Sequence, residues 1–439
     1  MKNKKNNKIW LILSSISTLT AILPLAAISC DHKVKQNSKE NKEDLKPDEN
    51  KPEPKSENPT KEEDLKPDQN KPEPKPQNPI KEEDSSNLNK KFKFELTKSN
   101  TWKIAKYIGN DSKVTIPGKY QGKNITEIGN RAFFHSVIQS VTIPSSVKEI
   151  DESAFSGCRN IKEVILNEGL EKIGAEAFYH TSIKSITIPS TVKEIGESTF
   201  SGCKNLKEVI LNKGLEKIGD EAFYDTNIES ITILGSVKEI GDEAFRYKNI
   251  KSITIPGSVK EIGKSAFSGC ENIKEVILNE GLEKIGAKAF RGVNIEYIVI
   301  PRSVKEIDQY AFSWCENLEE VILNEGLEKI GSGAFYHTKI KSITIPGSAK
   351  EIGESAFSDC EDLEEVILNE GLEKIGAEAF YKTKIKSITI PGSAKEIGER
   401  AFFNYWSPKE VIYKGDASNI NWENTGIGKT EIKIIPSNN

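Results

Sequence analysis

Several residue types are scarce in this 439-residue chain, or missing from parts of it. Six Cys are too few for a disulfide scaffold, and there are only four His. The formal net charge of −4 argues against a general nucleic-acid-binding protein. No Gly precedes Gly109, and residues 31–90 contain no Phe, Trp or Tyr. The composition therefore changes along the chain, and each segment needs its own interpretation.

Residues 1–29 have the pattern of a secretion signal. Four Lys lie within the first eight residues, and an apolar run follows from Ile9 to Leu25. This run is marginal for a membrane span, which needs roughly 20 residues. Its end, Ala27-Ile28-Ser29-Cys30, resembles the lipobox of bacterial lipoproteins, which implies lipidation of Cys30. The alternative is a plain signal or a weak membrane anchor in which Cys30 has no role.

Residues 30–90 are expected to be a disordered tether behind the lipid-anchor Cys. The segment has few large apolar residues, so it cannot bury enough surface to offset chain entropy. Nine of the 19 Pro lie between Pro47 and Pro79, which favours an extended, polyproline-like chain. We expect a spacer that holds the rest of the protein away from the membrane. A polyproline ligand for another protein is the alternative.

One repeat fills most of the remaining chain. Its marker is a Phe, usually preceded by Ala, that recurs every 22 or 23 residues: Phe133, Phe155, Phe178, Phe200, Phe223, Phe245, Phe267, Phe290, Phe312, Phe335, Phe357, Phe380 and Phe402. An apolar run follows most markers, as in Ile183-x-x-Ile186-x-Ile188. Ile186 and Ile188 share one parity, which indicates a strand with one buried face. A Glu-Lys-Ile-Gly step, expected to be a solvated turn, also recurs.

These units predict a solenoid. A 22-residue coil cannot bury its own apolar face, whereas stacked coils can, with their strands forming a parallel sheet. We expect about 13 coils in an α/β solenoid. Its sheet covers one face, and turns, short 3-10 or helical segments and extended segments cover the other. Two coil types alternate, except that the coils of Phe223 and Phe245 are both of the second type.

The repeat resembles the BspA-like, or treponemal-type, leucine-rich repeat. The resemblance is carried by Ile183-x-x-Ile186-x-Ile188-Pro189-Ser190-Thr191-Val192-x-x-Ile195-Gly196-x-x-Thr199-Phe200-x-x-Cys203 and its counterparts. Leu234 and Lys248 depart from the pattern. Together with the lipobox, the chain resembles a surface lipoprotein of the mycoplasma type. The resemblance implies host-surface adhesion or immune interaction, at the extracellular face of a bacterial membrane.

Five Cys form a column three residues after a marker Phe: Cys158, Cys203, Cys270, Cys315 and Cys360. Other coils carry Ser or Thr there, so we expect a small inward corner where the side chain meets turn backbone. Equivalent positions two coils apart are near 9.6 Å, at about 4.8 Å per strand. That separation is too long for a disulfide or a shared zinc ion. We expect no metal and no cofactor.

No catalytic constellation is predicted. His180 and His337 are seven coils apart, and every other candidate acid or base belongs to the repeat, whereas catalysis needs a convergent group. We therefore expect no enzyme and no small-molecule substrate.

Residues 91–130 are interpreted as an N-terminal cap with a first degenerate coil. Residues 131–402 are the repeats, and residues 403–439 are an aromatic C-terminal cap and tail.

The outward strand positions form the predicted partner-binding face. One column is aliphatic in alternate coils and the next carries carboxylates; the predicted residues are Ile165, Ile210, Ile277, Val299, Ile322, Ile367, Glu208, Glu275, Tyr297, Glu320 and Glu365. Exposed apolar stripes are uncommon without a partner. The alternative is that β-branched residues merely suit strands.

Two functions follow as hypotheses. The first is a monomeric, lipid-anchored module that binds a protein or glycan of a host or neighbouring cell through this face. The second is a structural or antigenic coat protein whose repeats vary and bind nothing specific. Neither involves nucleic acid.

Overall fold

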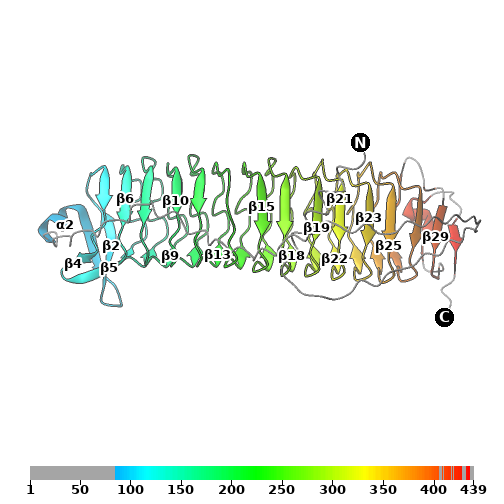
Figure 1. The fold of residues 1–439 in the computed structure, drawn as a ribbon, viewed down its shortest axis with the longest axis horizontal. Helices are drawn as coiled ribbons and strands as arrows, with labels where there is room; N and C mark the ends of the chain where they lie inside the picture. Colours follow the sequence, from blue (N-terminus) through cyan, green and yellow to red (C-terminus); the bar gives the residue numbers. More distant parts are fainter. Residues whose placement is uncertain are drawn as a thin grey trace, which may run out of the picture. The chain divides into compact units, whose positions relative to one another are not determined.

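The computed structural model describes residues 85–404, 408, 410–416, 418, 420–427 and 432–435. The signal segment, Cys30 and the tether up to residue 84 lie outside these residues. Coils stack side by side along one axis, from the cap around α2 to β29 near the other end (Figure 1). Each coil has three edges, two formed by strands and one by the turn that contains the marker Phe.

The first edge is one continuous sheet of sixteen strands. After the cap strands it takes a two-residue strand from every coil, so we call it the charged sheet. Its strands are β1 (Phe92–Leu96), β2 (Trp102–Tyr107), β4 (Lys119–Tyr120), β5 (Lys123–Ile128), β7 (Glu149–Ile150), β9 (Lys172–Ile173), β11 (Glu194–Ile195), β13 (Lys217–Ile218), β14 (Glu239–Ile240), β16 (Glu261–Ile262), β18 (Lys284–Ile285), β20 (Glu306–Ile307), β22 (Lys329–Ile330), β24 (Glu351–Ile352), β26 (Lys374–Ile375) and β28 (Glu396–Ile397).

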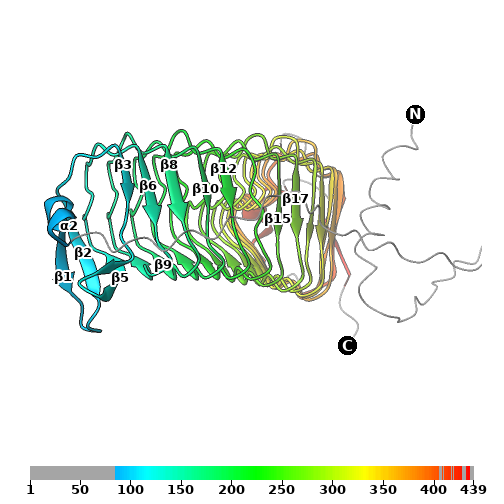
Figure 2. The same cartoon turned by 60° about the vertical axis from the view of Figure 1, so that its left-hand side comes forward.

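The second edge carries longer strands in five separate parallel groups, and we call its outward side the aliphatic face (Figure 2). The groups are β3 (Lys113–Thr115), β6 (Ser140–Ile143) and β8 (Glu163–Leu166); β10 (Ser185–Thr187) and β12 (Glu208–Ile210); β15 (Ser252–Ile255) and β17 (Glu275–Leu278); β19 (Tyr297–Ile300), β21 (Glu320–Leu323), β23 (Ser342–Ile345) and β25 (Glu365–Leu368); and β27 (Ser387–Ile390), β29 (Glu410–Tyr413) and β30 (Ile432–Ile434).

The third edge is the Phe turn. The marker rings are fully buried, and from Phe155 onward they stack with centroids 5.2–5.5 Å apart. The N–H of each marker Phe donates to the next coil, as from Phe178 to the carbonyl of Thr199 at 2.9 Å. Residues two before and two after Phe178, Glu176 and His180, have φ of 53° and 52°. Left-handed residues therefore flank the Phe, and the turn backbone is paired from coil to coil.

Glycine after the charged strand lets neighbouring coils approach closely. A Cβ on Gly219 would lie 2.7 Å from the carbonyl carbon of Gly196 and 2.8 Å from the amide nitrogen of Glu197. Both obstacles are backbone atoms, so no side-chain rotation can relieve the clash. At most of these steps Gly therefore permits the close coil approach, whereas Asp151 and Asp308 occupy the equivalent position in two coils.

The ends of the solenoid are closed by caps. Helix α2 (Ser85–Lys91) buries Leu88, and Phe92 packs against the first marker ring, Phe133, at 6.4 Å. At the other end, the last Phe turn donates from Phe402 N–H to the carbonyl of Thr425 at 2.9 Å. Thr425 ends the 3-10 helix η2 (Trp422–Thr425). The caps therefore complete the hydrogen bonds of the terminal coils as well as covering their apolar cores.

The structure confirms the solenoid with parallel sheet and changes three details. The Glu-Lys-Ile-Gly step, expected to be a solvated turn, supplies the strands of the charged sheet. Between the caps, the described coils have turns where short 3-10 or helical segments were expected. The tether was expected to extend to residue 90, but α2 begins at Ser85 and belongs to the N-terminal cap, because Leu88 is buried there.

The two adjacent coils of the second type, those of Phe223 and Phe245, form what we call the seam. The charged sheet passes through it, with β14 paired to both β13 and β16. On the other edge the segment 230–233 contributes only one isolated bridge, between Glu208 and Ser230. Lys248 is also buried here, at 2% exposure.

Candidate functional site

The predicted partner-binding residues lie outward on the aliphatic face. Ile165 and Ile210 are each 45% exposed and Ile367 is 47% exposed, whereas Ile277, Val299 and Ile322 are half-buried. The predicted columns are in register: Thr187 pairs with Ile210, and Val299 pairs with Ile322. Because the strands form five groups, the columns are interrupted between groups.

The carboxylate column of this face lies opposite uncharged residues. Glu208 is in register with Ser185, Glu275 with Ser252, and Glu365 with Ser342. Glu320 is in register with Tyr297. The pKa of the Tyr297 hydroxyl is raised, first by burial and then by the nearby charge of Glu275. The aliphatic face thus presents carboxylates whose register partners carry no positive charge.

The charged sheet is different, because its outward side chains neutralise one another. Coils of the second type present Lys-Glu and coils of the first type Glu-Lys, so unlike charges lie in register wherever the types alternate. Across the seam, where they do not alternate, Glu239 lies in register with Glu261. Lys172 reaches Glu149 at 2.9 Å, and Lys217 reaches Glu239 at 2.8 Å. The hydrogen bond that the Lys172 ammonium donates to the Glu149 carboxylate is the largest cause of the raised pKa of Lys172.

The Cys column occupies the expected inward corner. All five thiols are buried and free. Each donates to the carbonyl of the marker Phe one coil earlier; Cys270 donates to Phe245 at 3.0 Å and Cys315 to Phe290 at 3.2 Å. Burial raises the pKa of Cys270 to about 11 and that of Cys315 to about 12. The thiols are therefore protonated packing groups at neutral pH.

Lys248 replaces the small residue of this column at the seam. Its ammonium donates to the Thr226 carbonyl at 3.1 Å, and its backbone N–H donates to the Cys270 sulfur at 3.4 Å. Burial lowers the pKa of Lys248 to about 8. The sequence marked Lys248 as a departure from the repeat but did not reveal that its amine is buried.

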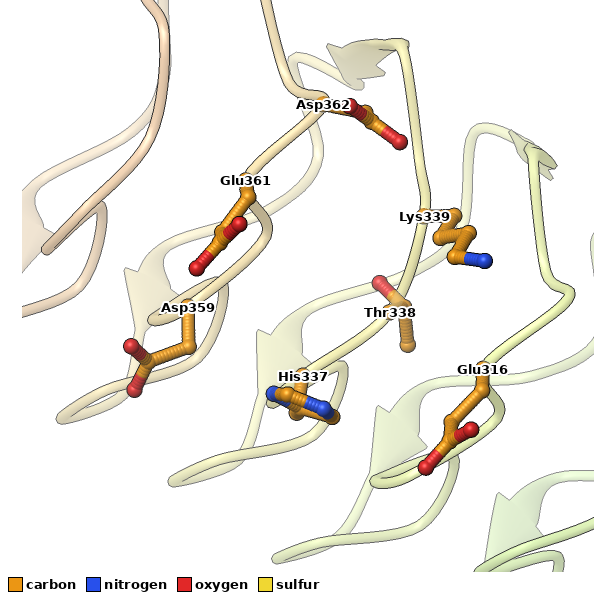
Figure 3. A pocket seen from close by; sticks show the side chains of 7 residues that line it. All are labelled: Glu316, His337, Thr338, Lys339, Asp359, Glu361 and Asp362. Carbon is orange, nitrogen blue, oxygen red and sulfur yellow. The ribbon is translucent and has the colours of Figure 1, made fainter.

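His337 lies in a shallow depression on the Phe-turn side (Figure 3). Carboxylates of Glu316 and Asp359, from the coils before and after, also line it. Asp359 is paired with Lys382 at 3.1 Å. His180, seven coils away, is not brought near His337. Among the described residues, no group of three or more His, Cys, Asp or Glu side chains is placed to hold a metal ion.

A further feature escaped sequence reasoning: a ridge of large side chains on the outer side of the Phe turns. Tyr247 is 55% exposed and Trp314 is 40% exposed, each two residues after a marker Phe. Between them, the equivalent positions are Gly269 and Gly292. A depression of about 450 Å³ lies at this place. The signal was present in the sequence as the alternation of aromatic residues and Gly in one column.

Comparison with known proteins identifies the class. The sequence matches the family described as "BspA type Leucine rich repeat region (6 copies)" over residues 126–249, 238–360 and 328–433, more than half of the chain. The chain therefore belongs to the BspA-type leucine-rich repeat family.

Solved structures of three bacterial proteins are similar to this chain. A leucine-rich cell surface protein from Faecalibacterium prausnitzii is 26% identical, with 64% of this chain and 93% of the other covered (TM-score 0.36). A leucine-rich repeat protein from Bacteroides ovatus is 25% identical, with coverage of 79% and 98% (TM-score 0.43). The pneumococcal vaccine antigen PcpA is 23% identical, with coverage of 79% and 97% (TM-score 0.48). Among curated proteins there is no match.

Proposed function

We propose that this chain is a lipid-anchored surface protein of the BspA type that mediates adhesion or protein–protein interaction with host molecules through its aliphatic face. The observation that carries the proposal is the column of exposed Ile165, Ile210 and Ile367. Family membership supports a repeat scaffold used for interaction. No catalytic role is part of this proposal.

The contrast between the two sheets favours this face as the interaction surface. Glu and Lys of the charged sheet pair with one another across the coils. The aliphatic face instead leaves apolar surface and carboxylates available to a partner. Several shallow contacts repeated along a rod suit multivalent binding.

The anchoring part of the proposal rests on the sequence of the lipobox. Two acyl chains on Cys30 hold a protein at a membrane firmly, whereas one chain holds it marginally. Cys30→Ser in the producing cell is expected to release a soluble secreted product. Unchanged membrane attachment of this variant would contradict lipidation. The described residues contain no helix long and apolar enough to cross a membrane.

The binding test uses the full chain displayed on cells and immobilised host matrix proteins. Ile210→Lys combined with Ile367→Lys places two charges on the aliphatic face, and we expect saturable binding to fall at least about tenfold. Val137→Lys is the matched control, because Val137 is an exposed aliphatic residue outside the predicted columns. Full binding by the double variant would reject the aliphatic face. Absence of saturable binding by the unaltered chain would favour the coat-protein function.

A further inference from the structure

The depression between Tyr247 and Trp314, here called the trough, lies where the repeat is locally singular. Coils of the second type usually place a large side chain two residues after the marker Phe, as at His180 and His337. The Phe290 coil instead has Gly292, and a Cβ there would meet nothing within 4 Å. Gly269 precedes it. The Tyr247 ring lies over Gly269, where a Cβ would collide with it, so the backbone is open at Gly292 and forms the floor there, between the Tyr247 ring and Trp314.

The Tyr247 and Trp314 rings form the two walls of the trough, and neighbouring side chains hold each ring in place. The Arg246 guanidinium lies 4.6 Å from the Tyr247 ring centroid and donates to the Tyr247 hydroxyl at 2.9 Å. Glu243 fixes Arg246 at 2.7 Å. The Trp314 ring packs on His337 at 4.2 Å between centroids. Because these supports fix the rings in advance, little side-chain freedom remains to be lost on binding.

The floor offers no free backbone to a ligand. Gly269 N–H donates to the Arg291 carbonyl at 2.8 Å, and Gly292 N–H donates to the Ser313 carbonyl at 2.9 Å. A peptide strand that adds to a sheet needs unpaired main-chain groups. The trough does not provide them at these glycines, so a ligand must be recognised by ring faces and rim side chains.

The rim carries planar polar groups. Arg291, Asn294 and Asn317 supply donors and amide acceptors, and Glu271 and Glu316 supply carboxylates. The Asn317 amide donates to Asn294, which orients the pair. Together the rim has one guanidinium and two carboxylates, a balance that disfavours an anionic ligand. Planar groups that donate and accept in pairs match adjacent hydroxyls, which do the same.

We propose that the trough binds a neutral oligosaccharide, with sugar rings stacked on Tyr247 and Trp314 and hydroxyls bonded to the rim. The C–H face of a sugar ring is weakly positive and packs on the negative face of an aromatic ring. The two walls are three coil steps apart, each 5.3–5.4 Å along the Phe column. That span suits a chain of several hexoses rather than one. The site lies on the Phe turns, apart from the aliphatic face, and goes beyond the function proposed above.

The test titrates the full chain with maltotetraose, cellotetraose and N-acetylchitotetraose by calorimetry and saturation-transfer NMR. We expect at least one tetrasaccharide to bind saturably at millimolar concentration or below, and more tightly than its monosaccharide. Tyr247→Ala and Trp314→Ala should each weaken that binding by at least about tenfold. Phe134→Ala is the matched control, because Phe134 is an exposed ring outside the trough. Asn294→Leu should also weaken binding, and it leaves both rings in place.

Several results would overturn the proposal. These are no binding of any of the three probes, undiminished binding by both aromatic variants, or tighter binding of a sulfated tetrasaccharide than of the neutral ones. Preference for a neutral Gly-Ser peptide over every saccharide would assign the trough to a protein ligand and reject a sugar site. The aliphatic-face variant with Ile210→Lys and Ile367→Lys should retain full saccharide binding. The two proposals can therefore fail separately.

Discussion

The charged sheet and the aliphatic face are built from the same coils but respond differently to the seam. The charged sheet continues through it, whereas the other edge loses its strand at 230–233. A charged strand needs only two residues, one of them a buried Ile, as in β14. A longer strand also needs the backbone directly after its last residue, here called the strand exit, to be held in place. The charged sheet is therefore continuous through the seam, whereas the longer strand is lost where its exit is not held.

The exit of the longer strand shows what is missing at the seam. Coils of the second type usually have Pro there, as at Pro189, and Pro biases the residue before it toward extended backbone. Coils of the first type have Asn, and Asn212 donates to the Ile188 carbonyl at 3.0 Å. Leu234, at the equivalent position in the seam, has neither the backbone restriction of Pro nor the side-chain hydrogen bond of Asn. Ile231 and Ile233 are accordingly less buried than Ile186 and Ile188 of a regular coil.

The largest expected effect comes from breaking the continuous sheet. Gly219→Ala inserts a Cβ against the backbone of the preceding coil, so we expect the free energy of unfolding to fall by about 1–3 kcal/mol. Gly235→Ala is the matched control, since a Cβ there meets nothing within 4 Å. Urea titration followed by circular dichroism measures both. Equal effects of the two variants would show that close coil approach is not what requires Gly219.

Removing the buried amine at the seam is expected to stabilise the solenoid. Lys248→Met keeps the volume and removes a desolvated charge, so we expect a gain of about 1–2 kcal/mol at pH 7. The folded pKa of Lys248 is about 8, below its ordinary value of 10.5, so the unfolded chain binds more protons between these values. The contribution of Lys248 to the stability of the unaltered protein therefore rises with pH across that window.

The advantage of Lys248→Met should accordingly be largest below pH 8 and shrink toward pH 10.5. Parallel urea titrations at pH 7 and pH 10 measure the difference. The four buried Cys other than Cys270 titrate alike in both proteins and cancel in the comparison, whereas Cys270 faces Lys248 and contributes to the difference. A gain independent of pH would mean that the packing of the methionine, and not the charge, is responsible.

The repeat and its exposed columns could be predicted because they are periodic. Spacing of the marker Phe gives the number of coils, and the parity of Ile186 and Ile188 identifies the buried side. Two-residue strands such as β14 could not be predicted, because two residues show no alternation. The left-handed turn residues could not be predicted for another reason. Positive φ is usually signalled by Gly, whereas Glu176 and His180 adopt it here without being Gly. The trough depends on neighbouring coils, so it appears only once they are stacked.

Restoring Pro at the seam should allow the longer-strand edge to form a strand there, as the charged sheet already does. Leu234→Pro supplies the missing restriction at the strand exit, and we expect a gain of about 0.5–1 kcal/mol. Hydrogen exchange should show slower exchange of amides in residues 230–233, because a strand forms there. A matched control is Leu323→Pro in β21, which constrains an exit where Asn324 already donates to the Ile300 carbonyl. It should not stabilise. No change in exchange after Leu234→Pro would indicate that the coil sequence itself, rather than its exit, prevents pairing.

The smallest expected effect concerns the charges that distinguish the two sheets. Lys329 lies in register between Glu306 and Glu351, so Lys329→Glu creates three adjacent carboxylates. Exposed pairs contribute little, and we expect a loss of about 0.5–1 kcal/mol in low salt that largely disappears in about 1 M salt. Glu320→Lys on the aliphatic face is the comparison, because its register partners are Tyr297 and Ser342 and no ion pair is lost. It should change stability by less than Lys329→Glu. Reversing the charge of a carboxylate loses an attraction only if a positive charge lies near that carboxylate. If Glu320→Lys lowered stability as much as Lys329→Glu, with the same dependence on salt, the two faces would not differ in the pairing of their charges.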